Sequence, residues 1–273
     1  MKSPIGVFDS GYGGLTILSH FQNYLPDYDY LYLGDNARAP YGTRSFEVVY
    51  EFTRQAVMRL FEEGCHLVIL ACNTASAKAL RTIQQIDLRC SYPDRRVLGV
   101  IRPTVEVISE ITRSRHVGIV GTAGTIQSES YPIEIHKLFP DIVVTSEACP
   151  MWVPLVENKE FDKPGADYFI EQHIDALLTK DPNIDTLVLA CTHYPLLESK
   201  IRSFLPKDIK VVSQGEYVAK SLQDYLMRHQ EIDQVCSKNG ICSFYTTESD
   251  VKFKEAASIF LCEDIDARHI SLG

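Results

Sequence analysis

Short apolar runs that end abruptly in polar residues recur along the chain. Residues 67–74 read LVILACNT, and residues 187–193 read LVLACTH. Each apolar run is short, branched and unbroken, which is typical of a strand buried on both faces of a parallel sheet. The polar residues follow where such a strand ends and a helix begins, and ligands bind at this carboxyl edge of open α/β sheets. The pattern therefore predicts two equivalent strand ends, which carry Cys72 and Cys191.

The same strand–loop–helix pattern occurs four times in each half of the chain. Residues 118–122 (GIVGT) align with residues 6–10 (GVFDS), so that Thr122 corresponds to Ser10. This pattern predicts an internal duplication. We expect an α/β fold of two pseudo-symmetric domains, each with a parallel sheet of the flavodoxin or Rossmann kind, and an active site in the cleft between them. The predicted strands are residues 5–8, 30–35, 67–71 and 97–101, and again 117–120, 141–145, 187–190 and 210–212.

Helices are predicted between the strands by their periodic apolar residues and their end signals. The first spans residues 15–24, the second spans residues 45–63, and the third spans residues 75–88 with Asn73 or Thr74 as its N-cap. The C-terminal segment has no counterpart in the duplication and is expected to extend one of the sheets. It contains a predicted strand at 241–246, a helix at 251–261 and a short strand at 267–270.

Composition and charge exclude several classes of partner. The 273 residues carry a net charge of −9 without a basic patch, which argues against nucleic acid. No stretch approaches the roughly 18 apolar residues of a membrane span, and no secretory signal precedes the first strand. The eight cysteines show neither CxxC nor zinc-finger spacing. We therefore predict no metal, and we expect free thiols in a cytoplasmic protein.

A glycine-rich turn follows the first strand. Residues 9–16 read DSGYGGLT, and the helix that follows would direct free N–H groups at an anion. The spacing is neither G-x-G-x-x-G nor G-K-[S/T], so a phosphate-binding loop and a plain strand-to-helix turn both remain open. Asp9 and Ser10, which are polar and lie at a strand end, favour a site. A second loop, residues 36–44, contains Pro-Tyr-Gly and is placed to fold over a pocket.

Two cysteines that face one small molecule from opposite sides define a reaction class. A stereocentre is inverted when a base removes a proton from one face and an acid returns a proton to the other. A thiol and a thiolate interconvert by one proton, and the free pKa of about 8.5 is near neutral pH, so Cys72 and Cys191 can exchange these roles. His193 is suited to tuning or relaying a proton. The alternative is an ordinary buried cysteine, our interpretation of Cys65, Cys90, Cys149, Cys236, Cys242 and Cys262.

Four motifs together resemble those of the glutamate branch of the cofactor-independent aspartate/glutamate racemase superfamily. They are DSGYGG at 9–14, PYG at 40–42, CNT at 72–74 and CTH at 191–193. The resemblance covers essentially the whole chain. It implies interconversion of L- and D-glutamate without pyridoxal phosphate, which would supply D-glutamate for peptidoglycan. It also implies a homodimer, a first domain of residues 1–100 plus 207–273, and a second domain of residues 101–206 inserted into it.

The resemblance also implies roles for single residues. Cys72 and Cys191 would be the two acid/base groups, assisted by Asp9 and His193 respectively. Glu157 would have a supporting role, and the alternative for it is a solvated loop carboxylate. Hydroxyl, amide and backbone N–H groups can bind carboxylates without lysine or arginine. The residues expected to hold the substrate are Asp9, Ser10, Tyr41, Gly42, Asn73, Thr74, Thr122, Thr192 and His193.

The chain departs from the pattern of this family in two places. Arg102-Pro103-Thr104 stands where many members have Glu-Pro-Gly, and Glu129 stands where glycine is common. The first departure lies at the predicted domain junction, so it concerns regulation and domain packing more than the chemistry. The chain also begins almost at its first strand, and we therefore expect activity without a cell-wall precursor as activator.

Two other functions fit the same sequence. A binding protein with two hinged lobes would bind glutamate without exchanging its α-hydrogen with solvent. A racemase for aspartate or another acid would keep both cysteines. The sequence alone separates it poorly from a glutamate racemase, because one methylene is worth only about 1–3 kcal/mol in a pocket.

Overall fold

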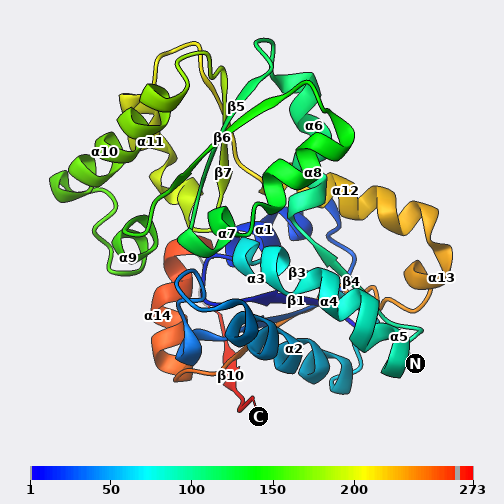
Figure 1. The fold of residues 1–273 in the computed structure, drawn as a ribbon. Helices are drawn as coiled ribbons and strands as arrows, with labels where there is room; N and C mark the ends of the chain where they lie inside the picture. Colours follow the sequence, from blue (N-terminus) through cyan, green and yellow to red (C-terminus); the bar gives the residue numbers. More distant parts are fainter. Residues whose placement is uncertain (1, 262–264, 273) are drawn as a thin grey trace.

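The computed structural model describes residues 2–261 and 265–272, and these residues form two parallel sheets (Figure 1). The first sheet has six strands in the order β10-β9-β2-β1-β3-β4, and every neighbouring pair is parallel. Its strands are β1 (Ile5–Asp9), β2 (Tyr30–Gly34), β3 (Leu67–Leu70), β4 (Arg96–Gly99), β9 (Cys242–Thr246) and β10 (Ala267–His269). The C-terminal segment thus extends the first sheet. The sequence predicted that it would extend one of the two sheets. Cys262 lies outside the described residues.

The second sheet has four parallel strands in the order β6-β5-β7-β8. Its strands are β5 (His116–Gly121), β6 (Val143–Ala148), β7 (Thr186–Ala190) and β8 (Lys210–Val212). The position of β8 corrects the predicted domain boundary. The prediction ended the second domain at residue 206, whereas β8 lies beyond that residue and belongs to the second sheet. Strand β8 pairs with β7, and Val212 is buried in the core of the second sheet with Val188.

The two sheets repeat one arrangement. The order β2-β1-β3-β4 in the first sheet corresponds to β6-β5-β7-β8 in the second. The register also matches, because Gly6 pairs with Val68 of β3 and Gly118 pairs with Leu187 of β7. The predicted α/β fold and its duplication are confirmed. Equivalent strand ends therefore carry the residues that follow β3 and β7.

The helices cover both halves of the molecule, and α1 (Leu15–Tyr24) and α2 (Phe46–Glu62) agree with the prediction. The predicted third helix is divided into short segments. Its N-cap is Cys72, whose sulfur accepts the Ala75 N–H at 3.5 Å, and not Asn73 or Thr74. The other segments of the first half are η1 (Asn36–Arg38), α3 (Asn73–Lys78), α4 (Leu80–Thr82), η2 (Ile83–Asp87), α5 (Leu88–Ser91), α12 (Gly215–Arg228), α13 (Gln230–Asp233) and α14 (Asp250–Leu261). Those of the second half are α6 (Ile101–Ile111), α7 (Ala123–Gln127), α8 (Ser130–Leu138), α9 (Trp152–Glu157), α10 (Pro164–Lys180), η3 (Tyr194–Leu197) and α11 (Glu198–Phe204).

Helices pack on both faces of each sheet, because successive strand side chains point into two different cores. In β1, Val7 packs with α1, α12 and α14, whereas Phe8 packs with α2 and α3. In β7, Leu187 packs with α10 and α11, whereas Val188 packs with α6 and α8. This burial explains the unbroken apolar runs of the strands. Within residues 2–261 and 265–272, no helix combines the length and apolar character needed to cross a bilayer.

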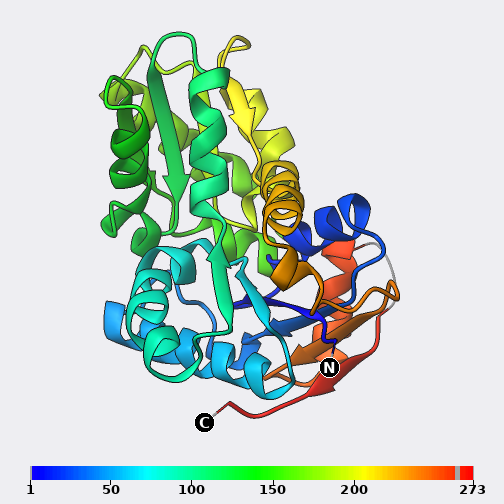
Figure 2. The same ribbon diagram turned by 90° about the vertical axis from the view of Figure 1, so that its right-hand side faces the viewer.

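The chain crosses between the halves twice, from β4 into α6 and from β8 into α12 (Figure 2). Arg102-Pro103-Thr104 lies in the first turn of α6 at the first crossing. Glu129, which precedes α8, has a φ of 53°. This left-handed backbone conformation favours glycine, which is the physical reason that glycine suits the position.

Candidate active site

The carboxyl ends of the two sheets meet at one cavity between the halves. The space between its walls, counted out to the open mouth, is about 710 Å³. Asp9 lies beneath the surface of the cavity and does not line it. The predicted site residues that do line it are Ser10, Tyr41, Gly42, Cys72, Asn73, Thr74, Thr122, Glu157, Cys191, Thr192 and His193.

Cys72 is fixed at the start of α3. Its Sγ accepts the Ala75 N–H and lies 3.4 Å from Ser10 Oγ. Burial raises the pKa of Cys72 to about 12, and the negative charge of Asp9 adds to this shift. At neutral pH Cys72 is therefore a thiol, which can donate a proton.

Asp9 ends β1 and is completely buried under the glycine turn. Its Oδ2 accepts the Gly11 N–H at 3.0 Å, and its Oδ1 has no hydrogen-bond partner among the described residues. Burial raises the pKa of Asp9, although the nearby His193 opposes this shift. A carboxyl group in such surroundings can hold a proton at a higher pH than an exposed carboxyl group.

Cys191 lies beside an imidazole that is itself held by a carboxylate. The Nδ1 of His193 is 3.9 Å from Cys191 Sγ, and its Nε2 is 3.0 Å from Glu157 Oε1. Burial alone would lower the pKa of His193, but hydrogen bonds and charge from Cys191 and Glu157 raise it to about 10. His193 is therefore a cation at neutral pH, and it lies beside the Cys191 sulfur. Glu157 lies in α9 and is bound to His193, so it is not a solvated loop carboxylate.

Threonine hydroxyl groups from both halves meet at the cleft. Thr74 Oγ1 lies 2.9 Å from Thr122 Oγ1 and 3.2 Å from Thr125 Oγ1. Thr122 also caps α7 by accepting the Thr125 N–H. The predicted site did not include Thr125; the repeated Gly-Thr in residues 121–125 is the sequence signal that could have found it. Hydroxyl groups in this cluster can donate hydrogen bonds to a carboxylate.

The loop of residues 36–44 forms one wall of the cavity and reaches the second half. The Tyr41 hydroxyl donates to the buried Asp35. The Gly42 carbonyl accepts the Gly124 N–H at 2.7 Å. The loop is thus held to the first half through Tyr41 and to the second half through Gly42.

The glycine turn packs against the groups around both cysteines. A Cβ atom at Gly13 would lie 2.7 Å from His193 Cε1, and one at Gly14 would lie 2.5 Å from the Asp9 Cβ. Distances this short do not occur in real packing, so both positions require glycine. At Gly13 the turn therefore packs directly against Thr192 and His193 of the second half.

Asn73 lines the cavity, but its amide group is engaged by the protein. Its Nδ2 donates to Gln214 Oε1 at 2.6 Å, and its Oδ1 accepts the Tyr131 hydroxyl at 2.7 Å. Sequence reasoning missed Gln214 and Tyr131 because neither belongs to a motif. Within the part of the chain that the structure describes, no group of three or more His, Cys, Asp or Glu side chains could hold a metal ion.

Comparison with known proteins identifies the class to which this fold and site belong. The Asp/Glu/Hydantoin racemase family model matches residues 16–222. The chain belongs to this family of racemases.

Within the family, the chain is similar to glutamate racemases over nearly its whole length. It is 39% identical over 272 residues to the glutamate racemase of Ruegeria sp., covering 96% of this chain and 97% of the relative. A crystal structure of a Bacillus anthracis glutamate racemase isoform has a TM-score of 0.89 and 36% identity, covering 99% of this chain and 98% of that one. The Francisella tularensis glutamate racemase, solved in complex with D-glutamate, has a TM-score of 0.87 and 31% identity over 99% and 98% of the two chains.

Proposed function

We propose that the protein is a glutamate racemase that inverts the α-carbon by proton transfer between Cys72 and Cys191. The observation that carries the proposal is that two thiols at equivalent strand ends, one from each half, line the same cavity. A substrate held between them presents one face of its α-carbon to each sulfur. The glutamate racemases among the relatives support glutamate as the substrate.

In one direction the Cys191 thiolate acts as the base and the Cys72 thiol acts as the acid. The S–H bond at Cys191 forms as the Cα–H bond breaks, and the electron pair remains on the α-carbon. That carbon then takes the proton of Cys72 on its opposite face, which leaves Cys72 as a thiolate. The reverse reaction starts from this second state, so the two thiols exchange roles with each inversion.

The unlike surroundings of the two thiols suit these alternating states. The His193 cation, held by Glu157, stabilises a thiolate at Cys191. When Cys72 becomes the thiolate, a proton on Asp9 removes the repulsion between two buried negative charges. The raised pKa of Asp9 supports this role.

Hydroxyl groups, and not cations, are proposed to hold the substrate carboxylates. Ser10, Thr74 and Thr122 line the cavity, and its lining among the described residues includes neither lysine nor arginine, while the His193 cation is held by Glu157. A cation would stabilise the carboxylates of the ground state and the transition state alike, and binding both states equally does not raise kcat.

The proposed role of the reaction is to supply D-glutamate for peptidoglycan synthesis in the cytoplasm. This role and the expected homodimer follow from the resemblance of the sequence and remain predictions. The proposed chemistry is carried by side chains of the chain itself.

The proposal is tested by following the α-hydrogen of glutamate in deuterated buffer. We expect purified protein to remove the circular dichroism signal of L-glutamate and of D-glutamate, with deuterium appearing at Cα in proton NMR. Saturable glutamate binding without exchange would indicate a binding protein and would refute the proposal. Inversion of aspartate but not of glutamate would keep the mechanism and refute the substrate.

We expect Gly13→Ala to lower the rate of glutamate racemisation strongly. The added methyl group must displace Thr192 or His193, and a displacement of about 1 Å at catalytic groups costs about 10²-fold in rate. Gly165→Ala is the matched control, because a Cβ atom there meets nothing within 4 Å. Equal kcat values for wild type and Gly13→Ala would contradict the proposed packing of the turn on the site.

A further inference from the structure

A buried hydrogen-bond network joins the two halves directly behind the cavity. Its members are Asn73, Thr104, Tyr131 and Gln214, each at most 3% exposed. Gln214 Nε2 donates to Thr104 Oγ1 at 2.9 Å and to the Tyr131 hydroxyl at 2.5 Å, while Gln214 Oε1 accepts from Asn73 Nδ2. The Tyr131 hydroxyl donates in turn to Asn73 Oδ1. The four side chains therefore form a connected network.

The network includes both points at which the chain crosses between the halves. Thr104 lies in the first turn of α6, at the first crossing, and its hydroxyl also donates to the Val100 carbonyl at 2.8 Å. Gln214 immediately precedes α12, at the second crossing. Tyr131 belongs to α8 of the second half, whereas Asn73 begins α3 of the first half. These four side chains thus join the two halves at both crossings.

Asn73 connects the network to the chemistry, because it follows Cys72 directly in the chain. Both polar atoms of its side chain are bound within the protein, so the amide holds the turn of residues 72–74 to the second half. Cys191 is carried by that second half. A change in the network is therefore expected to alter the position of one sulfur relative to the other.

We propose that Gln214 and Tyr131 are positioning residues, which hold Asn73 and thereby align the Cys72 sulfur with the half that carries Cys191. This inference rests on the proposed two-thiol reaction. In that reaction both sulfurs must face the same carbon, and a misplacement of about 1 Å costs about 10²-fold in rate. Asn73 accordingly acts through its place in the network and not through a side-chain contact with the substrate.

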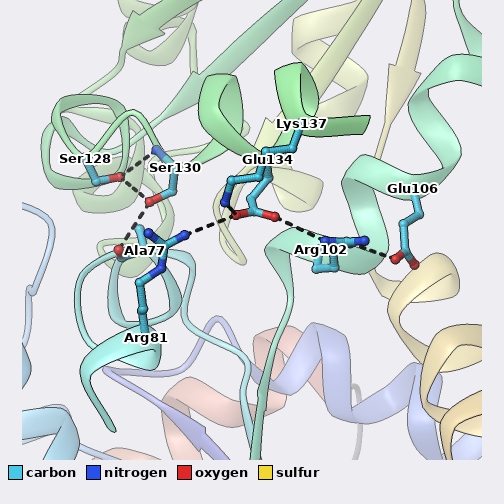
Figure 3. Close-up of polar contacts among 8 residues, drawn as sticks. All are labelled: Ala77, Arg81, Arg102, Glu106, Ser128, Ser130, Glu134 and Lys137. Carbon is cyan, nitrogen blue, oxygen red and sulfur yellow. Dashed lines mark hydrogen bonds and ion pairs between the residues drawn. The ribbon is translucent and has the colours of Figure 1, made fainter. Parts of the chain in front are cut away.

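Another link between the halves lies at the surface and provides a contrast. Arg81 of α4 contacts Glu134 of α8 at 3.4 Å across the halves, and Arg102 of α6 contacts the same carboxylate at 3.4 Å from within the second half (Figure 3). The two arginine side chains are 66% and 53% exposed. Exposed ion pairs contribute little, so Arg81→Ala is expected to change kcat by less than about twofold.

The test compares Tyr131→Phe and Gln214→Met with Tyr30→Phe. Tyr30 is a matched control, because it is a buried tyrosine whose hydroxyl lies 3.2 Å from the Phe21 carbonyl and 3.0 Å from the Leu25 carbonyl, away from the cavity. All three variants lose buried hydrogen bonds, which should lower the urea midpoint of each. Unfolding in urea measures this common effect.

Positioning predicts effects that a general loss of stability does not. In Tyr131→Phe and Gln214→Met we expect kcat to fall about 10- to 100-fold for both enantiomers, with KM changed less than about threefold. The acid and alkaline limbs of the pH profile of kcat should stay at their wild-type positions, because the network contains no charged group. Loosening of the turn should also raise the alkylation of Cys72 relative to Cys191 about threefold or more, as read by mass spectrometry of the free protein.

The outcomes separate this inference from the proposed function. Tyr30→Phe should lower the urea midpoint while keeping the wild-type kcat and alkylation ratio. A wild-type kcat in Tyr131→Phe and Gln214→Met, with only their stability reduced, would overturn the positioning role. If wild-type protein does not racemise glutamate, the proposed function fails by itself. The alkylation ratio then decides the inference, and an unchanged ratio overturns it.

Discussion

Cys72→Ser and Cys191→Ser should each lower the rate of glutamate racemisation by about 10²–10⁴-fold, the usual contribution of a general acid or base. A serine hydroxyl does not ionise near neutral pH, so one of the two proton transfers is lost. Serine keeps the shape of the side chain, and at position 72 it also keeps the N-cap of α3, because serine is a preferred N-cap residue. The loss of activity can therefore be assigned to the thiol and not to the fold.

The two variants should differ in the enantiomer with which they still react. The remaining thiol faces only one side of the α-carbon, so each variant should exchange the α-hydrogen of one enantiomer without inverting it. Proton NMR in deuterated buffer would show this exchange, with opposite enantiomers labelled by Cys72→Ser and by Cys191→Ser. Cys65→Ser is the control, because Cys65 is a buried cysteine in the core of the first half. Full racemisation by either active-site variant would exclude the two-thiol mechanism.

Glu157→Gln should lower kcat and move the alkaline limb of the pH profile to lower pH. Hydrogen bonds and charge from Cys191 and Glu157 overcome the effect of burial and raise the pKa of His193 to about 10. Loss of one charge-assisted hydrogen bond costs about 1.5–3 kcal/mol, which corresponds to a rate effect of about 10- to 100-fold. Without the carboxylate, His193 loses its proton at a lower pH, and the thiolate of Cys191 then loses its neighbouring cation.

The sign of the pH effect follows from the direction of the His193 shift. A pKa raised from 6.5 to about 10 in the folded protein stabilises the fold. This stabilisation is fully present below pH 6.5 and is lost as the pH rises through about 10. In wild type, both activity and the free energy of unfolding should therefore decline toward pH 10, and in Glu157→Gln the decline should begin earlier.

A second histidine–carboxylate pair in the same half provides the control for this prediction. His173 Nδ1 lies 2.8 Å from Glu147 Oε1, and neither residue lines the cavity. Glu147→Gln should leave the pH profile of kcat/KM at its wild-type position. An alkaline limb that is the same in Glu157→Gln and wild type would show that the Glu157 carboxylate does not set the protonation of His193.

The candidate site was partly predictable because its main residues follow recognisable strand ends. The positions of Cys72 and Cys191 could be predicted from an apolar run followed by a polar residue, since local patterns record which segment is buried and where it ends. Glu157 was harder to interpret, because its role depends on a 3.0 Å contact with a residue 36 positions away. Local patterns contain no information on such contacts.

The sequence by itself determined the α/β fold, its duplication and the two equivalent cysteine positions, because each of these is recorded in repeated local patterns. The tertiary structure alone decided that β8 belongs to the second sheet, where its pairing with β7 and the burial of Val212 hold it. It also decided the charge of His193 and the network that joins Asn73 to Gln214 across 141 positions. These features depend on how the two halves are placed against each other, because burial and neighbouring charges set a pKa and long-range side-chain contacts exist only in the packed molecule.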